Sequence, residues 1–235
     1  PGPAQERPFL SGLAVADGSS RFILSGSEDL GGGLRANFQI DNRFRLDDNG
    51  AAPTSNPVGT GNSFIGLSGN FGSVQLGKLD THYCQGVDSH GSRATALTAS
   101  SCAILGYVNV GGVNTAIGQQ TRTTNALRYT TPNMSGFTAQ LTYSTAQGGS
   151  EGVVGDAGKG RAISGNVNYA AGPIRAGLTV WNSKSESRVA GAAQADQKAY
   201  SAMANYNFGM GTVGVAFDRS TSINGTIGAA TVDSK

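Results

Sequence analysis

The chain has 235 residues, of which 14% are charged and 38% hydrophobic, and its formal net charge is +2. An ordinary soluble domain has about a quarter charged residues, while a disordered chain has a high net charge. Without clustered Lys and Arg we expect no nucleic-acid partner. Since no run of about 18 apolar residues is present, we also expect no transmembrane helix.

Alternation of apolar and polar residues begins at residue 21. In RFILSGS, Phe22 and Leu24 alternate with Arg21 and Ser25. After the turn SEDLGGG, the segment LRANFQID alternates strictly, with Leu34, Ala36, Phe38 and Ile40 on one side and Arg35, Asn37, Gln39 and Asp41 on the other. A period of two residues predicts β-strands with one apolar and one polar face.

The same alternation continues to the last third of the chain. It recurs in SFIGLSG, SVQLGK, NALRYTT, FTAQLTYS, RAISGNVNYA, IRAGLTVW, KAYSAMANYNF and TVGVAFDRS. About ten strand candidates exclude a helical or α/β domain. The connections alternate in length, because the short turns SEDLGGG, SGNFGS, PNMSG, YAAGP and NFGMG are separated by long polar segments near residues 45–61, 79–122, 145–160, 182–197 and from 219 onward.

Short turns at one end and long loops at the other are typical of a membrane β-barrel. In such a barrel one face of each strand meets lipid and the other a water-filled lumen. The polar face includes Thr138, Gln140, Thr142, Ser164, Asn166 and Asn168. Burying that row without water would cost roughly 1–3 kcal/mol per unpaired group. We therefore predict an all-β, antiparallel transmembrane β-barrel.

Aromatic residues near the strand ends are candidates for interfacial girdles. They are Tyr129, Phe137, Tyr143, Tyr169, Tyr206 and Phe208. Packing in the core of a soluble β-domain is the alternative for these side chains. The corresponding alternative for the protein is a secreted β-rich adhesin or glycan-binding module, with the polar face as its binding surface.

Three segments resemble the Gram-negative general porins, in particular their β-proteobacterial and neisserial branch. They are SRFILSGSEDLGGGLRANFQID, FIGLSGNFGSVQLGKLD and RTTNALRYTTPNMSGFTAQLTYS. The resemblance implies a sixteen-stranded barrel, of which about ten strands are visible here, and a chain that is incomplete at both ends. It also implies a homotrimer in the outer membrane of a Gram-negative bacterium, in contact with lipid and lipopolysaccharide, that passes small hydrophilic solutes and ions by passive diffusion.

The resemblance further implies a pore constriction. Residues 79–122 correspond to the family's inward-folded loop within a single barrel domain, and Asp80 and Asp88 are its candidate acidic residues. Arg21, Lys78 and Arg122 match positions of the basic wall opposite, whereas Arg35 and Arg128 join that wall by alternation alone. Alternation from Val74 and Leu76 points Lys78 outward, unless a bulge at Gly77 re-aims it. We expect anion selectivity, because these basic residues face only a few carboxylates of the loop. We expect it to be mild, because Gly61 and Asn62 stand where β-proteobacterial members often carry arginines.

The remaining polar residues give little support for catalysis or metal binding. Glu28 and Asp29 lie in a short turn, which favours a solvated role over acid–base chemistry. The group His82, Cys84, Asp88 and His90 matches no standard zinc-ligand spacing, so we expect no metal, cofactor or enzymatic activity.

Cys84 and Cys102 are the only two cysteines and share one Gly/Ser/Thr/Ala-rich region. An even pair of cysteines favours a disulfide formed in an oxidising compartment. Two unpaired thiols are the alternative.

Overall fold

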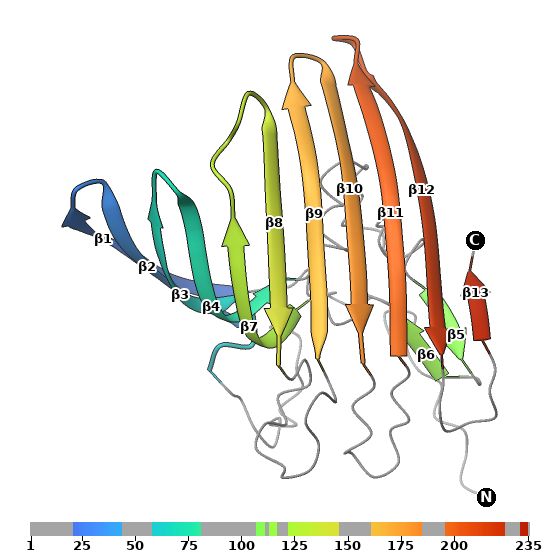
Figure 1. Cartoon of the computed structure of the whole chain (residues 1–235), viewed down its shortest axis with the longest axis horizontal. Coiled ribbons are helices and arrows are strands. Elements are labelled where there is room, and N and C mark those ends of the chain that lie inside the picture. Colours follow the sequence, from blue (N-terminus) through green and yellow to red (C-terminus); the bar gives the residue numbers. More distant parts are fainter. Residues whose placement is uncertain are drawn as a thin grey trace, which may run out of the picture.

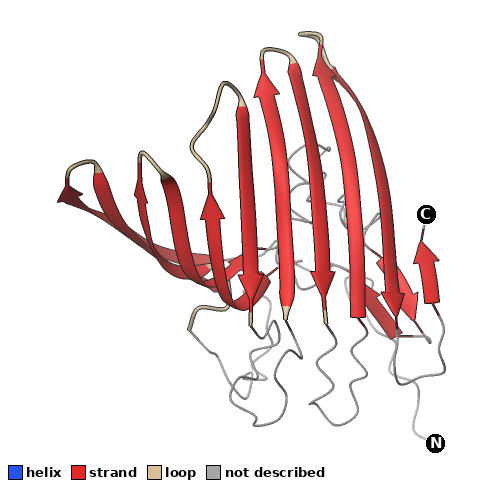
Figure 2. Cartoon of the chain, viewed as in Figure 1, coloured by secondary structure: helices blue, strands red, loops and turns tan. Residues whose placement is uncertain are grey.

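The computed structural model describes residues 21–43, 58–80, 107–110, 113–116, 122–145, 161–184, 196–223 and 231–234. Every regular element in these ranges is a β-strand (Figure 2), and none of them is a helix long and apolar enough to cross a membrane. The strands are β1 (Arg21–Gly31), β2 (Leu34–Arg43), β3 (Ser63–Gly69), β4 (Gly72–Asp80), β5 (Tyr107–Val110), β6 (Val113–Ala116), β7 (Arg122–Thr130), β8 (Phe137–Ser144), β9 (Ala162–Ala171), β10 (Ile174–Ser183), β11 (Asp196–Asn207), β12 (Thr212–Ile223) and β13 (Thr231–Ser234).

Eleven of the strands form one sheet in the order β1-β2-β3-β4-β7-β8-β9-β10-β11-β12-β13, and every neighbouring pair is antiparallel. The sheet is therefore a meander in which each strand lies beside the next one along the chain, except that β7 follows β4 and the β5–β6 hairpin forms a separate pair. It is curved, and β1–β4 turn away from the broad surface formed by β8–β12 (Figure 1). This confirms the predicted all-β antiparallel class.

The short turns all lie at one end of the sheet (Figure 1). The β1–β2 turn shows why its sequence is glycine-rich, because Gly31, Gly32 and Gly33 have φ values of 85°, 60° and 80°. Side chains other than glycine rarely adopt that left-handed region. The Gly31 amide donates to Asp29 Oδ1 at 2.8 Å, so Asp29 has a role within the turn.

The exposure of the two faces of the sheet is the reverse of that in a soluble protein, because the apolar side chains are exposed and the polar ones are covered. Large apolar side chains on one face remain open, with Leu178 61% and Val215 72% exposed. Small polar side chains on the other face are covered, with Thr142 2% and Ser164 1% exposed. A soluble domain buries its apolar face to gain the hydrophobic free energy, so this sheet is built for an apolar exterior.

The strand bounds differ from the sequence-based ones around residues 79–122 and 219 onward. Leu79 and Asp80 belong to β4 and Arg122 begins β7, so the connection between these strands is 81–121. The hairpin β5–β6 within this connection, and β13, were missed because four-residue strands carry too little alternation to read. β5 contacts β12 and β13, on the far side of the sheet from β4 and β7 (Figure 1).

Candidate pore wall

The polar face of β1 and β2 carries the first predicted site residues. Register pairs Arg35 with Asp29 and Ile23 with Asp41. The side chain of Arg21 reaches diagonally to Asp41, with 3.7 Å between Nη1 and Oδ2. Arg21 is 51% exposed and Asp41 only 3%, so the carboxylate lies within the wall and the guanidinium extends from it.

The surroundings of Asp41 explain the residue at position 61. The Gly61 amide donates to the Asp41 carbonyl at 2.7 Å, which fixes the two backbones side by side. A Cβ added at Gly61 would lie 2.1 Å from Asp41 Cγ, a distance that real Cβ atoms essentially never show. A side chain at position 61 would therefore overlap the Asp41 side chain in its present position. An arginine at position 61 would require the Asp41 side chain to move or to be replaced by a smaller residue.

A second polar cluster joins β3, β4, β7 and β8. Asn62 lies just before β3, and its side-chain Nδ2 donates to Asp80 Oδ2. The Arg128 guanidinium donates from Nε to Thr142 Oγ1 at 3.1 Å and from Nη2 to the backbone carbonyl of Asp80. Asp80 also pairs with Arg122 in the β4–β7 register. Among the predicted residues the structure thus brings Asp80 and Arg128 into contact and places Arg122 opposite Asp80 in the register. It adds Asn62 and Thr142 to this cluster.

The bulge lies in β7, opposite Lys78, because β4 advances two residues from Gly77 to Leu79 while β7 advances three from Ala126 to Thr123. The β4–β7 register shifts between Gly77 and Leu79. Gly77 has φ 148°, and a Cβ there would lie 2.2 Å from the carbonyl oxygen of Ser63. The β3–β4 register continues without a shift through Gly77 and Lys78, so the place of Lys78 on the basic wall stays a prediction.

The polar face of β8–β11 is almost free of charge. Most of its residues have hydroxyl or amide side chains. Within the described part of these strands, one charged residue, Arg175, lies on that face. Some of the buried hydroxyls bond to one another or to backbone, as do Thr179 with Ser201 and Ser144 with the Thr124 carbonyl. Among the described residues, Ser183 Oγ and the side-chain oxygens of Asn166 and Asn168 are buried without a hydrogen-bond partner. The charged part of the wall is therefore concentrated on β1–β4 and β7.

Three predicted site residues lie outside the described residues, namely Asp88, Cys84 and Cys102. Within the described ranges no group of His, Cys, Asp and Glu is arranged to hold a metal ion.

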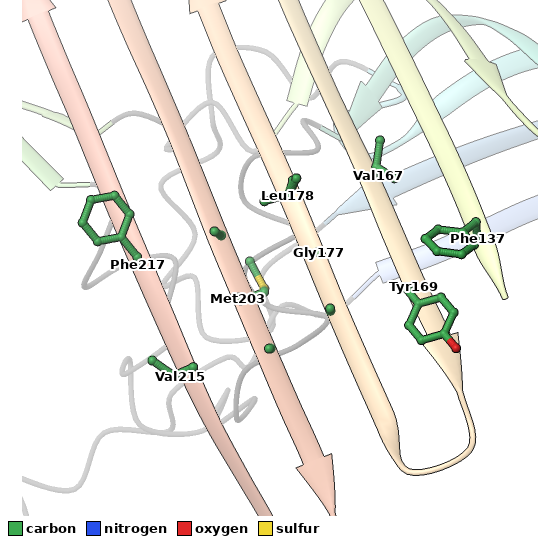
Figure 3. A pocket seen from close by; sticks show the side chains of 11 residues that line it. Phe137, Val167, Tyr169, Gly177, Leu178, Met203, Val215 and Phe217 are labelled. Carbon is green, nitrogen blue, oxygen red and sulfur yellow. The ribbon is translucent and has the colours of Figure 1, made fainter.

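The apolar face carries a shallow hollow of about 420 Å³ (Figure 3). Its walls come from β8 to β12, with Phe137 and Tyr169 on one side and Val215 and Phe217 on the other. The rings of Phe137 and Tyr169 are tilted, with centroids 4.6 Å apart. No charged side chain lines the hollow, so the hollow is distinct from the charged wall described above.

Comparison with known proteins identifies the family. The Gram-negative porin family profile matches residues 11–233, nearly the whole chain. The chain belongs to the Gram-negative porins. As a member of this family it is an outer-membrane protein whose strands cross the bilayer.

Individual porins agree with this assignment. Outer membrane porin protein 32 of Delftia acidovorans is 32% identical over 201 residues, which cover 85% of this chain and 54% of that protein. An outer membrane porin of Bordetella pertussis is 27% identical over 213 residues, covering 86% of this chain and 52% of that protein. The anion-selective porin from Comamonas acidovorans superposes with a TM-score of 0.67 at 26% identity, covering 92% of this chain and 61% of that one. The chain spans about half the length of the curated relatives it matches.

Proposed function

We propose that the protein forms a passive diffusion channel for small hydrophilic solutes and ions across the outer membrane. The observation that carries the proposal is the inverted pair of faces, with exposed apolar side chains outside and covered polar side chains inside. Lipid and lipopolysaccharide solvate the first face, and water solvates the second. The protein moves solutes without covalent chemistry, so it is a channel and not an enzyme.

The narrow part of the channel is formed by the β1–β4 and β7 wall and by the segment 79–122. The contacts of β5 with β12 and β13 support an inward path for this segment, since it leaves and rejoins the sheet at β4 and β7. Asp80 and Asp88 contribute negative charge at this level. Arg21, Lys78 and Arg122 contribute positive charge, with Arg35 and Arg128 in the same wall.

The selectivity that follows is a mild preference for anions. By strand register, the polar-face positions of the described strands hold more arginines than aspartates, namely Arg21, Arg35, Arg43, Arg128 and Arg175 against Asp29, Asp41 and Asp218. The end of β4 and the start of β7 add the register pair of Asp80 and Arg122. Several arginines have an aspartate close by, in the Arg21–Asp41 ion pair, the Arg35–Asp29 register pair and the contact of Arg128 with Asp80. This partial compensation weakens the field that an anion meets.

Three such barrels associate as a homotrimer, as in the general porins that the chain resembles. Chemical cross-linking of the folded protein in detergent tests this assembly. Bands no larger than a dimer would contradict it.

Reversal-potential measurements in planar bilayers test the channel and its selectivity together. Under a salt gradient the folded protein should give discrete conductance steps and a reversal potential displaced toward that of the anion. Clear cation preference would refute the selectivity, while absence of any conductance by a heat-modifiable, folded protein would refute the channel itself. A soluble, detergent-independent protein would instead favour an adhesin-like module.

A further inference from the structure

Arg128 differs from the other arginines of the polar face in its burial. It is 7% exposed, whereas Arg21 is 51% exposed. A guanidinium removed from water is costly unless its donors are satisfied. The contacts that satisfy it therefore show what this side chain does.

Those contacts lie on two different strands. Nε donates to Thr142 Oγ1 on β8, which is opposite Arg128 in the β7–β8 register and is itself 2% exposed. Nη2 donates to the backbone carbonyl of Asp80 on β4. A single side chain on β7 thus connects both neighbouring strands across the inner surface of the sheet.

The contact with Asp80 requires β4 to bend. In the β4–β7 register Arg128 is opposite Gln75, and Asp80 follows five residues later. In an extended strand that separation is roughly 16 Å, more than an arginine side chain can span. We infer that the bend arises where Thr124 and Asn125 of β7 stand opposite the single residue Lys78 of β4. Gly77, with φ 148°, and Asn125, with φ 51°, both depart there from extended backbone.

The bent strand end also carries the charges of the candidate constriction. Asp80 is the last residue of β4, receives a hydrogen bond from Asn62 and pairs with Arg122, the first residue of β7. The chain segment 81–121 departs from this pair and returns to it. Whatever holds Asp80 therefore sets where its carboxylate lies on the wall.

We propose that Arg128 is a positioning residue, a two-point clamp that holds the bent end of β4 against β8 and thereby fixes Asp80 and Arg122 on the pore wall. It acts through the geometry of these residues more than through its own charge, which is covered. The proposal rests on the proposed channel, but the clamp itself exists whether or not the protein conducts.

Two substitutions separate geometry from charge. Arg128→Lys keeps the charge but replaces the rigid fork of donors with a single flexible ammonium, which cannot reproduce both contacts. Thr142→Val keeps the shape and changes no charge but removes the acceptor of Nε. Thr142→Ser retains that acceptor, and Thr138→Val makes the same chemical change on the same face of β8 outside the cluster. Heat-modifiable migration on gels confirms that each variant is folded.

Hydrogen exchange of the folded protein in detergent micelles measures the clamp directly. Loss of a hydrogen bond to a charged group should raise local opening, and so amide exchange at residues 77–80, by about ten- to a hundredfold. We expect this rise in Arg128→Lys and Thr142→Val, and wild-type exchange in Thr142→Ser and Thr138→Val. Unchanged exchange in both of the first two variants would overturn the clamp without affecting the channel.

Planar-bilayer recordings then test the effect on the pore wall. Arg128→Lys and Thr142→Val should show larger open-channel current noise and a shifted reversal potential, because Asp80 and Arg122 no longer hold one position. A role limited to fold stability would leave both readouts at their wild-type values. If both variants match the wild type while Arg128→Met shifts the reversal potential, Arg128 is a simple pore charge and the proposal is wrong.

Discussion

Neutralising Asp41 offers the sharpest test of how the basic wall is compensated. The change Asp41→Asn is nearly isosteric and keeps an oxygen acceptor, but removes the negative charge 3.7 Å from Arg21. Asp41 is covered and Arg21 is half exposed. A passing ion therefore contacts the Arg21 guanidinium directly, and the Asp41 carboxylate behind it acts on the ion only through its electrostatic field.

The size of the effect follows from the ion-pair geometry. An anion bound to Arg21 lies about 7 Å from Asp41, which is the 3.7 Å of the ion pair plus about 3 Å for the anion's own contact. At that distance in water a unit charge changes the energy of a monovalent ion by about 0.6 kcal/mol. The energy falls for an anion and rises for a cation, so the anion-to-cation permeability ratio should rise about sevenfold. Screening over a Debye length of about 10 Å at 0.1 M salt reduces this to about threefold.

The assay is the reversal potential of the variant and the wild type under the same salt gradient, repeated at high and low mean salt. The shift should be toward anion preference and should shrink as salt rises. Asp29→Asn is a matched control, because it removes the same charge at the turn end of the sheet, and it should shift the potential less. An unchanged Asp41→Asn potential, or a shift toward cations, would show that Asp41 does not compensate Arg21 in the pore.

Three further predictions concern the wall and the lipid-facing surface. Gly61→Ala should displace the Asp41 side chain and lower stability by about 1–3 kcal/mol, measured as a lower temperature of heat modification on gels; wild-type behaviour would contradict the predicted overlap. Leu178→Arg places a cation near the middle of the apolar band and should destabilise the barrel by about 2–4 kcal/mol, measured by denaturant unfolding in lipid, whereas a neutral effect would mean that this face is not in contact with lipid. The double change Arg21→Gln and Arg122→Gln should move the reversal potential toward cations, and no shift would remove both residues from the constriction.

Much of the fold could be predicted from the sequence, because side chains alternate between the two faces of a strand. The two faces of this sheet meet environments of very different polarity, lipid on one side and water on the other. Neighbours such as Phe38 and Gln39 differ in polarity at every step of the strand, so the two faces of β2 follow directly from the sequence. The turns were equally clear, since their glycines and Asp29 meet a specific conformational need.

The geometry of the wall was less accessible. Arg128 was assigned to the polar face by alternation, but its contact with Asp80 depends on the bend near Gly77 and Asn125. No local pattern encodes that bend. Asn62 carried no signal either, because it lies before the strand and its partner Asp80 is 18 residues away.

The mutual pairing of the polar side chains has a consequence for transport kinetics. Asn37 donates to Ser68, Gln140 donates to Thr130, and Thr179 shares a hydrogen bond with Ser201. Where side chains of the wall bond to each other, as in these three pairs, they offer few strong sites to a passing sugar or amino acid, and weak binding lets a solute leave as readily as it enters. In the proposed channel, flux should therefore grow in proportion to solute concentration, with no early saturation, so the bacterium would take up nutrients in step with their supply outside.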